Sequence, residues 1–134
     1  MQISELATVE TKTIRLPRRV VDRRTVRQMI EVTVAAALDL PVEELGAKTR
    51  RTAPIAFARQ ISMYCAHVTF GWSLTEAGAV FGRDRTTAAH ACRVVEDRRD
   101  DAHVDTVVAS VEGALHHWLF AIEGCRAAAP GAPQ

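Results

Sequence analysis

Residues 73–96, which read SLTEAGAVFGRDRTTAAHACRVVE, constrain the fold of this chain more than any other stretch. Ser73 followed by Glu76 is the pattern of a capping box, which begins a helix. Gly82 suits a left-handed turn, and Asp84 suits the N-cap of a second helix. The stretch therefore predicts two short helices joined by a tight glycine turn.

The second of these helices has two faces of different chemistry. Small apolar residues recur at positions i, i+3, i+4 and i+7 and predict a buried stripe, namely Ala88, Ala91, Cys92 and Val95. The rest of its surface carries side chains that donate or accept hydrogen bonds, namely Arg85, Thr86, Thr87, His90 and Arg93. A polar face at the N-terminal end of a second helix is typical of a helix-turn-helix that enters the major groove of DNA.

Basic charge is concentrated around this motif. The whole chain has a formal net charge of only +1, which favours no class of partner. Between Leu45 and Val95, however, seven cationic side chains accompany two acidic ones, a local net charge of +5. The cationic residues are Lys48, Arg50, Arg51, Arg59, Arg83, Arg85 and Arg93. Such a distribution favours contact with nucleic acid.

Apolar periodicity predicts further helices at residues 22–38, 41–46, 55–69 and 103–123, so the expected fold class is all-α. The first of them is expected to bury Val26, Met29, Ile30, Thr33 and Ala37. The chain divides into a basic N-terminal arm at 1–21, a DNA-binding domain at 22–100, a C-terminal amphipathic helix at 101–125 and a disordered tail at 126–134. The arm is expected to be extended; it either contacts the DNA backbone or is partly disordered.

The C-terminal helix carries a long apolar stripe that two interpretations explain. The stripe packs onto the domain's own core, or part of it forms a surface for a second copy or another regulatory protein. The residues expected on that partner surface are Val111, Leu115, Trp118 and Leu119.

Two stretches resemble the C-terminal DNA-binding domain, domain IV, of the bacterial replication initiator DnaA. Residues 58–66, ARQISMYCA, are similar to the family's ARQIAMYLA helix, and residues 81–93, FGRDRTTAAHACR, are similar to its FGGRDHTTVLHACR motif. The resemblance implies a small all-α domain with a helix-turn-helix, which is Trp-repressor-like and binds duplex DNA. Arg85 replaces the family's usual histidine, and one glycine of the turn is absent.

Carried over by position, the resemblance implies two sets of contacts with DNA. The base-contacting residues would be Asp84, Arg85, Thr86, Thr87 and His90. Arg51 would enter the minor groove from a basic loop. The resemblance also places His67, Leu74 and Thr75 near phosphates. The residues themselves add further candidates for contact with the backbone, namely Lys48, Arg50, Ser73, Arg83 and Arg93.

We interpret the chain as a sequence-specific protein that binds duplex DNA and regulates transcription. Two alternatives stay open: a modulator of replication initiation that acts at origin sites, and an interaction module that kept the fold but lost base reading. Nothing indicates an enzyme, a cofactor or a metal site, because no phosphate loop, nucleophile motif or CxxC pair is present. The polar N-terminus and the absence of a long apolar run predict a cytoplasmic protein at the nucleoid.

Overall fold

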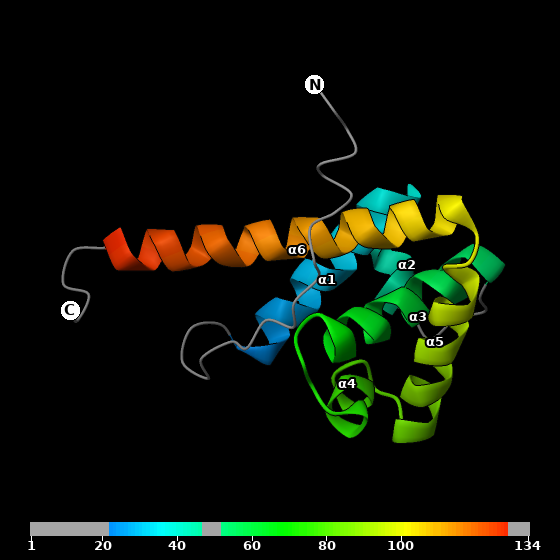
Figure 1. Ribbon diagram of the computed structural model, residues 1–134. Helices are drawn as coiled ribbons and strands as arrows, with labels where there is room; N and C mark the ends of the chain where they lie inside the picture. The colour runs from blue at the N-terminus through cyan, green and yellow to red at the C-terminus, as the bar shows by residue number, and fades with distance from the viewer. Residues whose placement is uncertain (1–21, 47–51, 129–134) are drawn as a thin grey trace.

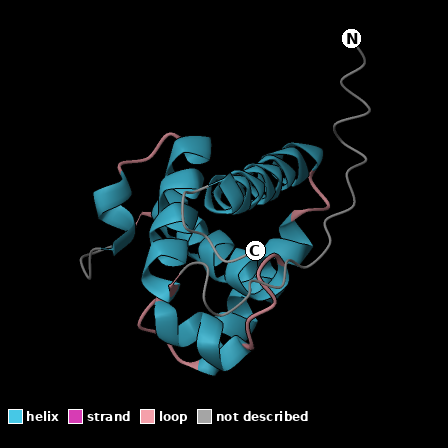
Figure 2. Ribbon diagram, turned by 90° about the vertical axis from the view of Figure 1, so that its left-hand side faces the viewer, coloured by secondary structure: helices cyan, strands magenta, loops and turns pink. Residues whose placement is uncertain are grey.

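The computed structural model describes the backbone of residues 22–46 and 52–128, and side chains as far as Cys125. The described residues form helices and no strands, so the all-α prediction is confirmed. The helices are α1 (Arg23–Leu38), α2 (Val42–Gly46), α3 (Ala53–Val68), α4 (Leu74–Val80), α5 (Arg85–Arg98) and α6 (Ala102–Ala128). α3 contacts α1, α2, α4 and α5 and is labelled among them in Figure 1; Figure 2 shows the same helices turned by 90°.

Local sequence determines most of the helix ends. The Asp22 carboxylate accepts a hydrogen bond from the Thr25 amide at 2.7 Å and caps α1, while Asp39 ends that helix in the left-handed region at φ 55°. Asp101 caps α6 by accepting from the amide of His103 at 2.8 Å. Each cap satisfies backbone groups that lack a partner at a helix terminus.

α3 lies at the centre of the main core. Four of its residues are completely shielded from solvent: Ala58, Ile61, Cys65 and Ala66. α1, α4 and α5 pack against this helix, and α2 covers part of it. α1 contributes Val26, Ile30, Val34 and Ala35. The buried face of α1 thus differs from the prediction, because it faces both α3 and α6 and excludes Ala37.

α6 packs along α1, and its last turns project past the other helices in Figure 1. Its apolar stripe lies inside the main core, with Val111 at 1 %, Leu115 at 0 % and Leu119 at 2 % exposure. Trp118 is half-buried and packs against the same core. Val111, Leu115 and Leu119 therefore lie in the domain's own core, as the first interpretation of the stripe expected, while a partner contact at the partly exposed Trp118 stays a prediction.

The boundaries of α6 differ from those expected from the sequence. The helix begins at Ala102 and continues to Ala128, so it includes the first three residues that we assigned to the tail. The predicted arm at residues 1–21 and the remaining tail at 129–134 lie outside the described residues.

A buried ion pair joins α6 to the turn after α5. The Arg99 guanidinium donates through Nη1 to Glu112 Oε1 at 2.6 Å and to the Tyr64 hydroxyl at 3.1 Å, and through Nε to Asp105 at 2.6 Å. Glu112 is completely buried, and its other oxygen, Oε2, has no hydrogen-bond partner among the described residues. Burial, followed by the charge of Glu112, raises the pKa of Tyr64. The network holds α3, the α5–α6 turn and α6 in one arrangement.

None of the helices in the described ranges combines the length and apolar character that crossing a bilayer requires.

Candidate nucleic-acid interface

The predicted helix–turn–helix is present as α4, a four-residue turn and α5. The capping box at its start is complete, because the Glu76 amide donates to Ser73 Oγ at 3.1 Å and the Ser73 amide donates to Glu76 Oε2 at 3.4 Å. Gly82 occupies the left-handed region at φ 69°, where a side chain would be strained. Asp84 then caps α5 by accepting from the Thr87 amide at 2.8 Å.

A second glycine, Gly78, sets how closely the two helices approach. Its carbonyl accepts hydrogen bonds from the amides of Phe81 and Arg83, at 3.0 and 2.8 Å. A Cβ atom on Gly78 would lie 2.6 Å from the carbonyl oxygen of Asp84 and 2.9 Å from that of Arg83. Both obstructing atoms belong to the backbone, so a side chain here would push the start of α5 away from α4.

Replacing Gly78 with alanine is expected to lower the free energy of unfolding by about 1–3 kcal/mol, the usual cost of overpacking. The first turn of α5 should exchange its amide protons faster, and affinity for DNA should fall with it. Gly113→Ala is the matched control, because a Cβ there meets nothing within 4 Å. In a helix, that change should instead stabilise by about 0.5–1 kcal/mol. Denaturant unfolding of both variants tests this, and equal effects would contradict the close approach at Gly78.

α5 is held by two groups of buried side chains. Ala88 and Ala91 pack with Met63 of α3 in a small cluster that Leu74 and Phe81 border. Cys92 and Val95 join the main core one and two turns later. All four predicted stripe residues are therefore buried. Because α5 is fixed along its length, the direction of its outer face is fixed too.

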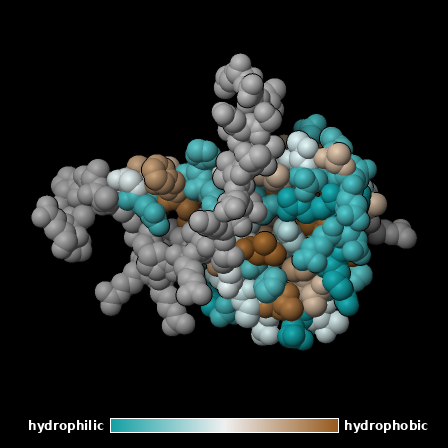
Figure 3. Space-filling view, in the orientation of Figure 1, coloured by the Kyte–Doolittle hydropathy of each residue, from teal (hydrophilic) through white to brown (hydrophobic). Residues whose placement is uncertain are grey.

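That outer face carries exposed polar side chains. Thr86, His90 and Arg93 lie opposite the buried stripe, and Arg85 and Thr87 lie at its two flanks. All five are exposed. Figure 3 shows a mainly hydrophilic surface on the side of the molecule where α5 lies. The face therefore presents two guanidinium groups, two hydroxyl groups and one imidazole to a partner.

The family model for the bacterial DnaA protein helix-turn-helix matches residues 26–95, slightly more than half of the 134-residue chain. The match spans α1 to most of α5, so it covers the element that the geometry singles out. This chain belongs to the DnaA helix-turn-helix family. It therefore carries a DNA-binding domain, and α6 lies beyond the part that the family model covers.

Several side chains that we predicted as DnaA-type contacts have structural partners. Asp84 uses Oδ1 to cap α5, and this hydrogen bond to the Thr87 amide lowers the pKa of its carboxyl. Only its second oxygen is left for a base. Because the folded-state pKa is lowered, the cap is lost as the pH falls through that value.

His67 is held by the turn that follows α3. Its Nδ1 lies 2.6 Å from the carbonyl oxygen of Trp72, and that acceptor requires a proton on Nδ1. The neutral ring then has only a lone pair on Nε2. His67 can therefore donate to a phosphate only as the imidazolium ion, so the predicted contact requires a positively charged ring.

The N-terminus of α4 also differs in character from a simple phosphate site. Ser73 Oγ accepts from the Glu76 amide, Leu74 packs against the core, and Thr75 is exposed. The Glu76 carboxylate lies at the same helix end and pairs with Arg23 at 3.0 Å. A phosphate bound at this helix end would lie near that negative charge. Because Thr75 is exposed, it is better placed for a phosphate contact than Ser73 or Leu74.

The basic-loop contacts Lys48, Arg50 and Arg51 lie outside the described residues, between the ends of α2 and α3. Arg83 and Arg93 lie at the turn and on the outer face of α5, half-exposed and exposed respectively. Sequence reasoning missed Gly78 and the half-buried Arg27, which donates to the Val80 carbonyl at 2.8 Å and ties α1 to α4. The sequence signal that could have identified Gly78 is the presence of a glycine inside a predicted helix.

The buried thiols offer no chemistry at this interface. Burial raises the pKa of Cys92 to about 11 and also raises the pKa of Cys65, so both stay protonated near neutral pH. They serve as small apolar side chains in the packing of α3 against α5.

Proposed function

We propose that this protein binds specific sequences of duplex DNA and regulates transcription, with α5 lying in the major groove. The observation that carries the proposal is the contrast between the two faces of α5. One face is completely packed, while Arg85, Thr86, Thr87, His90 and Arg93 are all exposed on a helix whose direction is fixed. No packing requirement explains why these five positions are polar.

Each exposed group near the N-terminus of α5 suits a base edge. The Arg85 guanidinium can pair with O6 and N7 of guanine, a contact that discriminates by about 1–3 kcal/mol. Hydroxyl groups at Thr86 and Thr87 can donate or accept, and a threonine methyl group can contact the methyl of thymine. His90 lies one turn further along. The helix therefore supports reading of a few successive base pairs.

A second contact is proposed for the basic loop that follows α2. The resemblance to the DnaA domain implies that Arg51 enters the minor groove. The basic character of the same loop favours Lys48 and Arg50 near the backbone. Such contacts position a protein on the duplex and add salt-dependent affinity.

Transcriptional control is favoured over a role at replication origins by the departures at the recognition end. Arg85 stands where the family usually has histidine, and the turn has one glycine instead of two. These changes alter the groups that meet the bases, which favours a target other than the origin box. If the sequences that the protein binds instead match the origin box, a modulator of replication initiation is favoured.

Selection from a pool of random duplex DNA tests the proposal. We expect enrichment of one short consensus that contains a guanine opposite Arg85. If no sequence is enriched at any salt concentration, the protein does not read bases, and the alternative of an interaction module gains support. Position-specific chromatin binding near promoters in cells would separate transcription from replication.

A further inference from the structure

α4, the short first helix of the helix-turn-helix, buries little with its own side chains. Its buried residues are one alanine and one glycine. α1 adds two arginines that reach the two ends of α4. Arg23 pairs with Glu76 near the start of α4 at 3.0 Å, and Arg27 donates through Nη1 to the carbonyl oxygen of Val80 at its end, at 2.8 Å. The position of α4 therefore depends on polar contacts with α1 as well as on packing.

Arg27 makes the stronger of these two contacts. The side chains of Arg23 and Glu76 are 57 % and 41 % exposed, and such surface pairs contribute little. Arg27 and Glu31 are 36 % and 12 % exposed, and they pair within α1 at 2.7 Å. Glu31 thus orients the guanidinium group, whose planar fork can still donate to the carbonyl of Val80. That carbonyl belongs to the last turn of α4, where such groups have no partner within the helix.

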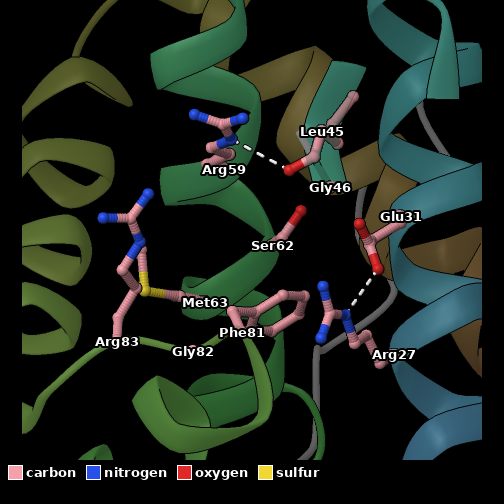
Figure 4. A pocket seen from close by; sticks show the side chains of 10 residues that line it. All are labelled: Arg27, Glu31, Leu45, Gly46, Arg59, Ser62, Met63, Phe81, Gly82 and Arg83. Atoms are coloured by element: carbon pink, nitrogen blue, oxygen red, sulfur yellow. Dashed lines mark hydrogen bonds and ion pairs between the residues drawn. The ribbon is translucent and has the colours of Figure 1, made fainter. Parts of the chain in front are cut away.

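Phe81 connects Arg27 to the buried side of α5. It is the C-cap of α4, and the Arg27 guanidinium lies 5.5 Å from the centroid of its ring, a favourable cation–π distance. The same residue packs against the small cluster in which Met63 of α3 contacts Ala88 and Ala91 of α5. Figure 4 shows the Phe81 ring with Met63 on one side and Arg27 on the other. A shift of Phe81 would therefore change the surface on which the first turns of α5 rest.

We propose that Arg27 is a positioning residue for base reading by α5. It holds the end of α4 through Val80 and Phe81, and this fixes where the first turn of α5 begins. That turn carries Arg85. The inference rests on the proposed function, because the position of α5 affects specificity only if α5 reads bases. Arg27 acts through the turn and needs no contact with DNA of its own.

Replacing Arg27 with methionine should lower the ratio of affinities for the selected duplex and a scrambled duplex about tenfold, because the base contacts of α5 lose their alignment. The salt slope for the scrambled duplex should stay unchanged, since no phosphate contact is removed. Arg27→Lys should keep a larger ratio than Arg27→Met, because an ammonium group can still donate to the carbonyl of Val80. Arg24→Met is the charge-matched control on the exposed side of α1, and it should change the ratio by less than about twofold.

Three further measurements separate positioning from a general loss of stability. Val108→Ala opens space in the core at α6, lowers stability there, and should keep the wild-type ratio. Glu31→Gln should lower the ratio about two- to threefold in the wild type but not in Arg27→Met, because Glu31 acts through Arg27. The amides of Gly82 and Arg83, which donate within the turn, should exchange faster in Arg27→Met but not in Arg24→Met. Glu31→Gln also keeps the test available if Arg27→Met does not fold.

Two results would overturn the positioning role of Arg27. One is a wild-type ratio in folded Arg27→Met, or a ratio that Val108→Ala lowers equally. The other is an equal loss of affinity for both duplexes with a salt slope lower by about 1, which would indicate a direct phosphate contact. Failure to enrich any sequence would instead contradict the proposed function. In that case, unchanged exchange of the Gly82 and Arg83 amides in Arg27→Met would still show that Arg27 does not hold the turn.

Discussion

Replacing Arg99 with methionine is expected to lower the free energy of unfolding by about 3–5 kcal/mol, because it leaves the Glu112 carboxylate buried without a cation. Glu112 is completely shielded, and its Oε1 accepts a 2.6 Å hydrogen bond from Arg99. A domain of this size is stable by only about 5–15 kcal/mol, so the loss would be a large share of the total. Urea unfolding followed by circular dichroism measures it.

The electrostatic surroundings of Arg99 support this expectation. Burial alone would lower the pKa of Arg99, but hydrogen bonds to Asp105 and Glu112 outweigh that effect and raise it. The guanidinium is therefore charged at every relevant pH. Its side chain is 22 % exposed, so water screens it only in part.

Two companion variants make the test specific. Glu112→Gln keeps an acceptor for Arg99 and should cost less than Arg99→Met. The double variant with Arg99→Met and Glu112→Leu should recover much of the loss, because a buried pair replaced by apolar side chains of similar size is often neutral. If the double variant is as unstable as the sum of the single changes, the penalty does not come from an unpaired buried charge.

Removing two side chains from the outer face of α5 is expected to abolish sequence discrimination. Arg85→Ala and Thr87→Ala together should weaken binding of the selected duplex by about thirtyfold or more, since each base contact contributes roughly 1–3 kcal/mol. Both side chains are exposed and neither packs against the core, so the fold should be retained. Binding of a scrambled duplex should fall far less.

A matched pair of changes at a distance controls for this result. Arg98→Ala combined with Thr106→Ala also removes one cation and one hydroxyl, from the far end of α5 and from α6. Both positions are exposed. This variant should keep at least half of the wild-type affinity ratio between the selected and scrambled duplexes.

Short-range signals in the sequence predicted the helix-turn-helix well. The capping box at Ser73, the left-handed Gly82 and the Asp84 cap all depend on residues within one turn of each other, and all three are present. The buried stripe of α5 followed in the same way from helical spacing. Local chemistry is sufficient for such features because the backbone conformation of a turn decides them.

Features that depend on tertiary contacts were missed or wrong. Glu112 lies within the apolar stripe of α6, but its partner Arg99 follows from the path of the α5–α6 turn, which periodicity does not reveal. Ala37 shares a side of α1 with Val26 and Ile30 by helical spacing, yet it is exposed near the end of the helix, because the neighbouring helices decide which residues of that side are covered. The role of Gly78 likewise depends on a tertiary contact, because the backbone of Asp84 lies against it.

The most direct test of base reading by α5 is the ratio of affinities for the selected and scrambled duplexes, measured at one fixed salt concentration. The wild type should prefer its selected sequence by roughly a thousandfold or more. The Arg85→Ala, Thr87→Ala double variant should show a ratio at least about thirtyfold smaller, with its circular dichroism spectrum unchanged. A ratio that stays at the wild-type value in this folded variant would contradict the assignment of α5 as the recognition helix.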